Sequence, residues 1–184
     1  MKKFMIALLC LALMGTCALA EPTAADATVA ATPTVSPTAS PTPIPAGEAF
    51  SCDDLTINLP YGLTLMDGDA LAGYEAAVQD DFEDTATTLA VATDDDGAMM
   101  LLAVCDSETD CVTAASEAAQ DILGEGASVT ALQFGDVSCA AFACSIQERE
   151  YRIYFFSNGT QLLCVGTSGL TDAQISASLE SLKF

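Results

Sequence analysis

The chain has 184 residues, of which 26 are acidic and 5 are basic, and it contains no histidine. The net charge of −21 excludes nucleic acid and anionic membrane surfaces as partners of the folded part, because a strongly acidic protein repels both at long range. The lack of histidine removes the most common general base and the histidine partner of serine and cysteine nucleophiles.

The first twenty residues have the features of a bacterial export signal. Two lysines precede an apolar segment, residues 4–14, and Ala-Leu-Ala at 18–20 is a small-x-small cleavage site. We therefore predict a secreted or cell-envelope protein from which residues 1–20 are removed. Two alternatives stay open: the segment is retained as a membrane anchor, or Cys17 carries a lipid. Removal would leave three basic residues against 26 acidic ones, a net charge of 3 − 26 = −23.

A linker rich in Pro, Thr, Ser and Ala follows at residues 21–49 and holds six of the seven prolines. Apolar burial there cannot offset the cost of ordering the backbone, so we predict an extended, solvated stalk. Its reach is at most ~90 Å, at roughly 3.1 Å per residue in polyproline geometry. The remaining segment, 50–184, has the length of one domain with its own core.

The first half of this domain begins with two strands and a helix. Polar and apolar residues alternate over 53–60, which predicts a half-buried strand that ends at Pro60. A turn and a short strand at 63–65 follow. The apolar spacing then predicts a helix over 69–81, which has acidic residues at both ends.

A hairpin follows this helix. Two apolar runs, 87–93 and 98–104, flank the sequence Asp94-Asp95-Asp96-Gly97. Asp-Gly tolerates the positive φ angles of tight turns, so the runs are predicted to pair as antiparallel strands. The second run is continuously apolar, which predicts a strand covered on both faces.

Residues 107–124 are predicted to form the main helix. Ser107 or Thr109 is expected to cap it, Asp110 suits its first turn, and Gly124 ends it. Its apolar stripe is predicted to consist of Val112, Ala115, Ala119 and Ile122.

A four-strand antiparallel meander is predicted over 128–167. Asn158-Gly159 between two apolar runs is a strong hairpin signal, and it explains these residues better than the N-glycosylation sequon that they form with Thr160. A two-residue loop there would place Ser157 opposite Thr160 and Ile153 opposite Cys164.

The chain closes with a predicted helix that starts near Thr171. Thr171 and Gln174 have the spacing of a capping box, and three apolar residues share one helical face. These residues are Ile175, Leu179 and Leu182. Runs of strands separated by single helices predict an α+β fold, in which helices pack on the faces of an antiparallel sheet.

The first strand, LTINLPYG, the apolar hairpin, the long helix, the meander and the closing ISASLESLKF resemble the PsbP/Mog1-like family over residues 50–184. Members often have a tryptophan after the first-strand proline, which this chain lacks. Many exported bacterial members are small lipoproteins. The resemblance implies an accessory or partner-binding role without enzymatic activity, and it implies no cofactor and no shared active site.

Acidic clusters are the candidates for calcium, which binds six to eight oxygens. The clusters are Asp94-Asp95-Asp96, the set Asp106, Glu108 and Asp110, and the pair Asp67 and Asp69. Turn chemistry explains the first cluster better than calcium binding does, and the preference of a helix N-terminus for negative charge explains the second better. No metal is therefore assigned. A hydrolase that uses two carboxylates is a further alternative, but no catalytic motif is present.

Six cysteines remain after residue 20, an even number that permits up to three disulfides in an exported protein. Cys105 and Cys111 bracket a short strand-to-helix loop and form the easiest bridge. Cys139 and Cys144 should lie on opposite faces of one strand, whereas Cys144 and Cys164 share a face two strands apart, ~10 Å and beyond bonding distance. The alternative is that the cysteines are small buried apolar residues.

Aromatic residues fall on both faces of the strand around residue 154. The face with Arg152, Tyr154 and Phe156 lies either beneath a helix or forms a patch that binds a partner. Together these observations predict a non-enzymatic accessory or protein-interaction domain displayed on a stalk, with an unknown protein as its partner. A small-molecule binder is the first alternative, and a closed pocket with a few inward polar groups would favour it.

Overall fold

A computed structural model describes residues 45–72, 87–146 and 148–184. The predicted export signal, the alternative lipid site at Cys17 and nearly all of the predicted linker lie outside these ranges. The predicted helix over 69–81 is described only at its start, where residues 68–72 are helical. In the described part of the chain, no helix is both long and apolar enough to cross a bilayer.

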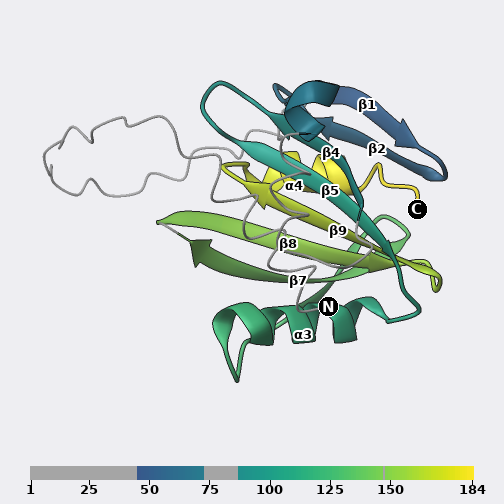
Figure 1. The fold of residues 1–184 in the computed structure, drawn as a ribbon, viewed down its shortest axis with the longest axis vertical. Coiled ribbons are helices and arrows are strands. Elements are labelled where there is room, and N and C mark those ends of the chain that lie inside the picture. The colour runs from purple at the N-terminus through teal and green to yellow at the C-terminus, as the bar shows by residue number, and fades with distance from the viewer. Residues whose placement is uncertain (1–44, 73–86, 147) are drawn as a thin grey trace, which may run out of the picture.

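The protein has an α+β fold built on a seven-stranded antiparallel sheet (Figure 1). The strand order is β3-β4-β5-β9-β8-β7-β6. The strands are β3 (Thr64–Leu65), β4 (Thr87–Thr93), β5 (Met99–Asp106), β6 (Thr130–Phe134), β7 (Val137–Ile146), β8 (Arg149–Ser157) and β9 (Gln161–Ser168). The predicted hairpin β4–β5 and the four-strand meander β6–β9 are therefore confirmed.

The register of the last hairpin differs from the prediction by two residues. Ser157 pairs with Leu162, and Ile153 pairs with Gly166. The turn is longer than two residues because the Asn158 side chain closes it: its Oδ1 accepts the amide N–H groups of Thr160 and Gln161, at 3.1 and 2.8 Å. A shift of two residues keeps each side chain on its predicted face.

A strand that the sequence did not predict opens the domain. β1 (Ala46–Cys52) pairs antiparallel with β2 (Leu55–Pro60) in a separate two-stranded sheet. β1 begins inside the range predicted as linker, so the ordered domain starts before residue 50. Gly47 allows a close approach here, because a Cβ atom at this position would lie 2.2 Å from the carbonyl oxygen of Leu59.

One face of the large sheet is covered by α3 (Cys111–Leu123), which packs on β7 and β8. The cap of α3 is Asp110, not Ser107 or Thr109 as predicted, because the Asp110 carboxylate accepts the amide N–H groups of Val112 and Thr113. The buried stripe also differs from the prediction, since Val112 is 46% exposed. The stripe consists of Ala114, Ala115, Ala118 and Ala119.

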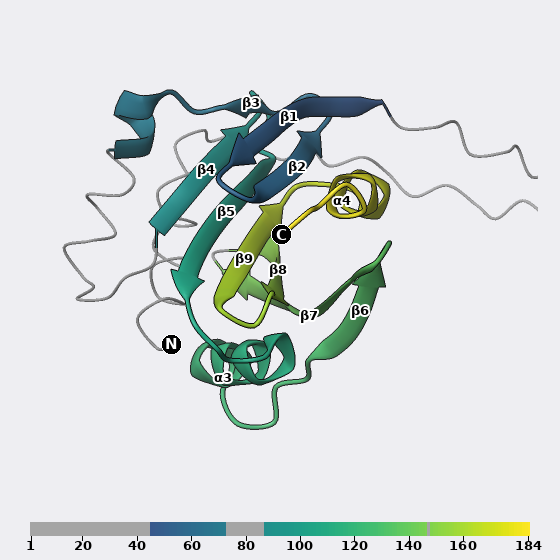
Figure 2. The same ribbon diagram turned by 90° about the vertical axis from the view of Figure 1, so that its right-hand side faces the viewer.

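The other face is covered by the β1–β2 hairpin and α4 (Asp172–Leu179), as Figure 2 shows. The predicted capping box is confirmed, with Thr171 and Gln174 each accepting from the backbone amide of the other. Ser178 Oγ donates to the Asn58 carbonyl oxygen at 2.5 Å and so joins α4 to β2. The chain end is joined to the same strand, because Thr56 and Lys183 exchange two backbone hydrogen bonds of 2.9 and 2.8 Å.

Candidate ligand pocket

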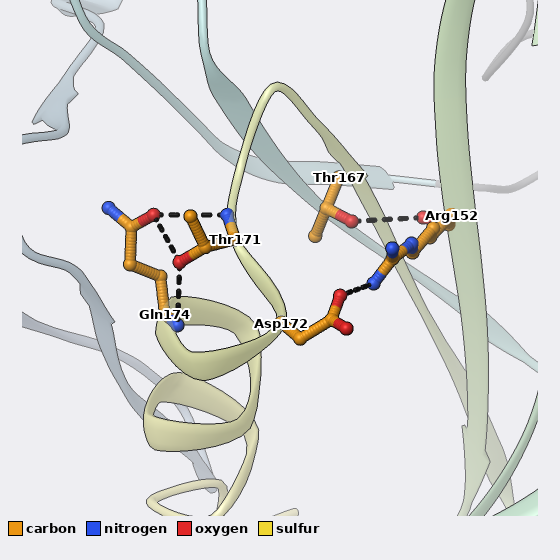
Figure 3. Close-up of polar contacts among 5 residues, drawn as sticks. All are labelled: Arg152, Thr167, Thr171, Asp172 and Gln174. Atoms are coloured by element: carbon orange, nitrogen blue, oxygen red, sulfur yellow. Dashed lines mark hydrogen bonds and ion pairs between the residues drawn. The ribbon is translucent and has the colours of Figure 1, made fainter. Parts of the chain in front are cut away.

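A pocket of about 290 Å³ opens at the end of the sheet where β8 begins and β9 ends. Its charged lining residues are Glu148, Arg149, Glu150 and Arg152 on the β7–β8 turn and β8, and Leu170 and Ile175 supply apolar surface at the start of α4. Residues 167–169 complete the lining. Figure 3 shows the part of this site around Arg152 and the N-terminus of α4.

Neutral groups hold Arg149 in place within the described part of the chain. Its Nε donates to Ser168 Oγ at 2.7 Å, and Ser168 Oγ in turn donates to the Glu150 carbonyl oxygen at 2.9 Å. The guanidinium carbon lies 6.0 Å from the centroid of the Tyr151 ring, within the range of a cation–π contact. Among the described residues, no carboxylate forms an ion pair with Arg149, although Glu148 and Glu150 flank it in the sequence.

The two terminal nitrogens of Arg149 lie beside the β4–β5 turn. A Cβ atom added to Gly97 would lie 3.6 and 3.7 Å from them, and the φ angle of Gly97 is 81°. Because residue 97 is glycine, no side chain from this position covers the Arg149 guanidinium. A guanidinium presents parallel N–H donors that match a carboxylate in a bidentate arrangement.

Arg152 differs from Arg149 because it is already paired. Its guanidinium donates to the Asp172 carboxylate at the start of α4, and this bond raises the pKa of Arg152 (Figure 3). Thr167 Oγ1 donates to the Arg152 carbonyl oxygen at 3.3 Å from the neighbouring strand β9. The side chains of Arg152 and Asp172 are 43% and 82% exposed, so solvent weakens their attraction. Arg152 therefore forms a wall of the pocket, whereas Arg149 retains binding capacity.

This pocket was not predicted from the sequence. Arg152 was predicted to belong to a patch with Tyr154 and Phe156, and no role was predicted for Arg149. The available signal was that Arg149 and Arg152 are two of three basic residues after residue 20 and stand three positions apart. The lining of the pocket comes together only in the folded chain, because a complete hairpin separates residues 148–152 from 167–170 in the sequence.

The predicted partner patch of Arg152, Tyr154 and Phe156 is wrong. Tyr154 is 5% exposed and Phe156 is fully buried, and both belong to the core beneath α4 and the β1–β2 hairpin. The alternative of helix cover is the one observed. Burial raises the pKa of the Tyr154 hydroxyl, although nearby Arg152 partly offsets this effect. Of the three residues, only Arg152 retains substantial contact with solvent.

One carboxylate in each acidic cluster accepts local backbone hydrogen bonds. Asp94 Oδ1 accepts the amides of Asp96 and Ala98, and Asp67 Oδ1 accepts the amide of Ala70. Asp110 caps α3, and hydrogen bonds from Thr113 lower the pKa of its carboxyl group. Within residues 45–72, 87–146 and 148–184, no three His, Cys, Asp or Glu side chains gather as a metal site would require.

All six cysteines in the described ranges are free thiols, so the predicted bridge between Cys105 and Cys111 is not formed in this structure. Cys139 lies in the core beneath α4, whereas Cys144 and Cys164 lie in the core beneath α3, as their predicted faces require. Burial raises the pKa of Cys139 to about 12 and also raises the pKa of Cys144. These buried thiols therefore behave as small apolar residues.

A second, smaller pocket of about 150 Å³ lies at the opposite end of the sheet. Asp53 and Asp54 supply its charged groups, and none of the described residues that line it is basic. It therefore lacks the donors that an anionic group would need. The arginine-lined pocket is the better candidate for ligand binding.

Comparison with known proteins adds little to this description. No family model matches the sequence, and no curated protein matches it. A crystal structure from Bacteroides thetaiotaomicron VPI-5482 at 1.50 Å resolution is similar, with a TM-score of 0.48 and 11% sequence identity. The match covers 75% of this chain and 48% of that chain, so the match spans about half of that protein. The resemblance to the PsbP/Mog1-like family stays a prediction.

Proposed function

We propose that this protein is an exported, non-enzymatic binding domain on a flexible stalk, and that it binds a small ligand bearing a carboxylate in the pocket of Arg149 and Arg152. The observation that carries the proposal is the guanidinium of Arg149, which has no ion-pair partner among the described residues. It lines a pocket in a domain where carboxylates greatly outnumber basic residues. A charge that none of the described carboxylates neutralises is available to a carboxylate from outside.

The distribution of exposed aromatic and apolar side chains favours a small ligand instead of the protein partner expected from the sequence. An exposed aromatic patch would have favoured a protein, but Tyr154 and Phe156 are buried. The large apolar side chains with the greatest exposure are scattered, which is typical of an ordinary surface. They are Tyr61, Val112, Leu123 and Leu132.

Titration of the exported full-length protein with 4-methylpentanoate tests this proposal. Calorimetry or amide chemical shifts would report binding, and the shifts should cluster around residues 148–152 and 167–170. Arg149→Gln should weaken binding at least tenfold, because it removes a hydrogen bond to a charged group, which contributes about 1.5–3 kcal/mol.

Lys183→Gln is the matched control, because it removes the same charge outside the pocket. It should change the dissociation constant less than twofold. Equal weakening by both variants would indicate non-specific charge attraction and would contradict the proposal. The absence of any 4-methylpentanoate binding at 50 mM would contradict it as well.

A further inference from the structure

The strand β6 forms one edge of the large sheet, because among the described strands it pairs with β7 alone (Figure 2). Its residues, Thr130–Phe134, include no charged residue and no proline, and their register with β7 is unbroken. Natural edge strands usually carry a lysine, a proline or a bulge, which prevents pairing with another chain. β6 has none of these protective features.

The other edges of the described sheets do carry such protection. At the opposite edge of the large sheet, β3 has two residues, and the register of β4 beside it shifts between Thr88 and Ala90. In the small sheet, β1 contains Glu48, and its register shifts between Ala46 and Ala49. Among the described edges, β6 is therefore the best suited to accept a further strand.

The turn after β6 determines which backbone groups of this strand face outward. Phe134 and Val137 flank a two-residue turn whose first residue, Gly135, has a φ of 56°. Residues that flank such a turn form a hydrogen-bonded pair, and hydrogen-bonded pairs then alternate along the strand. The N–H and C=O groups of Ala131 and Gln133 therefore point away from β7. Among the described residues, no hydrogen bond outside the β6–β7 ladder reaches these backbone groups.

The side chain of the residue between these two adds apolar surface to the edge. Leu132 is 38% exposed and pairs with Cys139, which lies in the core beneath α4. Because paired residues point to the same face of an antiparallel sheet, Leu132 extends this apolar face to the edge. A residue opposite Leu132 on an added strand would place its Cβ about 4.5–5.5 Å away. An apolar side chain at that position would cover Leu132.

The charged side chains around this edge are all negative. Residues 4–148 include no lysine or arginine, so β6, β7 and α3 carry no positive charge. The exposed residues Glu125 and Asp136 lie before and after β6, and a Cβ atom added to Gly135 would lie 3.7 Å from the carbonyl oxygen of Glu180. A second copy of this chain would bring like charges together, whereas a strand that carries lysine or arginine would meet opposite ones.

We propose that β6 accepts an extended, basic segment of another protein as a further strand of the large sheet. The added backbone would pair antiparallel with Ala131 and Gln133, an apolar side chain would cover Leu132, and flanking lysine or arginine side chains would lie near Asp136 and Glu180. Strand addition derives its affinity from backbone hydrogen bonds, so it requires no exposed aromatic patch. The proposal does not depend on the arginine-lined pocket, to which β6 contributes no residue.

Three synthetic peptides test this proposal when titrated into the exported full-length protein. The first is acetyl-Thr-Lys-Thr-Val-Thr-Lys-Thr-amide, in which valine and both lysines share the face that would cover Leu132. The second carries glutamate in place of both lysines. The third keeps the lysines but is N-methylated at the two threonines beside valine, which removes the donors that would face β6. The first peptide should bind about tenfold more tightly than either control, and its amide shifts should cluster at residues 130–134.

Variants of the edge test the same contacts from the side of the protein. Ala131→Pro removes an outward N–H but no hydrogen bond to β7, so it should weaken binding of the first peptide about tenfold with little change in the urea midpoint. Ala131→Ser keeps the N–H and is the matched control. Asp136→Asn or Glu180→Gln should weaken binding about two- to threefold. Asp54→Asn, which removes the same charge from the β1–β2 turn, should have no effect.

The possible outcomes separate strand addition from its alternatives. Equal affinity for the methylated and unmethylated lysine peptides would indicate charge attraction alone and would overturn the proposal, even if Ala131→Pro failed to fold. Equal affinity for the lysine and glutamate peptides would overturn the basic class of partner. A concentration-dependent dimer in analytical ultracentrifugation that Ala131→Pro abolishes would assign the edge to a second copy and overturn the proposal as well. So would the absence of binding by the first peptide.

Discussion

The two faces of the large sheet are covered in different ways. On one face, the 13-residue helix α3 rests on the sheet through four buried alanines. On the other, an eight-residue helix, a hairpin and the chain end are assembled from the two extremes of the domain. Asn58 and Ser181, which hydrogen-bond across this second cover, are 123 residues apart in the sequence. The first cover depends on close approach of small side chains, whereas the second depends on bonds between distant segments.

Adjacent aromatic residues on β8 allow the two faces to be compared directly. Phe155 lies beneath α3 and Phe156 beneath α4, and each is at most 1% exposed. Phe155→Ala and Phe156→Ala should each lower the free energy of unfolding by about 3–5 kcal/mol in urea titrations. Leu123→Ala, at a residue 47% exposed, should change it by less than about 0.5 kcal/mol. A Phe156→Ala protein that unfolds in two steps would show that the faces are independent, and would contradict a single cooperative core.

The close packing of α3 on the sheet can be tested by enlarging a buried side chain of this helix. Ala118 is 1% exposed against the sheet, so Ala118→Leu should cost about 1–3 kcal/mol through overpacking. Ala177 is exposed on α4 and serves as the matched site. Ala177→Leu should be nearly neutral in the same urea titration. If Ala118→Leu left the urea midpoint unchanged, the interface between α3 and the sheet could accommodate a larger side chain. That result would contradict the close packing described above.

The bonds that join distant segments on the α4 face are expected to contribute less. The Asn58 amide donates to Ser181 Oγ at 2.8 Å, so Ser181→Ala should cost about 1–2 kcal/mol by leaving this amide unpaired. Hydrogen exchange at Asn58 should accelerate more than exchange within α3. Ser116→Ala, at a half-buried serine of α3 whose hydroxyl donates to Val112 in the same helix, should stay within about 0.5 kcal/mol. Acceleration spread evenly over both faces would argue against a local role for Ser181.

The helix caps give the smallest predicted difference, which depends on pH. The pKa of the Asp110 carboxyl group is lowered in the folded protein, chiefly by the side-chain hydrogen bond from Thr113. Its stabilising contribution is therefore present above the unfolded pKa, near pH 4, and is lost as the pH falls through the lower folded value. The cap of α4 is the hydroxyl of Thr171, which does not titrate in this range.

Melting temperatures from pH 7 to pH 2 test this difference between the caps. The decrease caused by Asp110→Ala should shrink as the pH falls, whereas the decrease caused by Thr171→Ala should not change in this way. Asp110→Asn keeps an acceptor at the cap and is the control for charge. Parallel pH profiles for Asp110→Ala and Thr171→Ala would refute the prediction.

Local patterns were sufficient to predict most of the elements. The helix over 107–124, the hairpin around Gly97, the meander and the capping box at Thr171 each depend on neighbouring residues, and each is present in the structure. Errors arose where several local acceptors compete. Ser107, Thr109 and Asp110 can all cap a helix, and only the carboxylate also receives a hydrogen bond from the Thr113 hydroxyl.

The pocket was not predictable because its parts meet only in the folded chain. Residues 148–152 and 167–170 come together through the pairing of β8 with β9, whose register was predicted two residues away from the observed one. β1 was missed for a related reason, since its sequence follows a proline-rich segment and becomes a strand only by pairing with β2. Local sequence therefore identified the elements better than the site between them.

The backbone pairing of Thr56 with Lys183 has a consequence for the order in which the domain is completed. Thr56 lies near the start of the ordered domain and Lys183 follows α4, so the α4 face is completed only when these two distant segments meet. Until then the apolar residues of β2 lack their final cover. Loss of the segment that carries Lys183 would therefore uncover apolar residues of β2 even if every strand of the large sheet stayed intact.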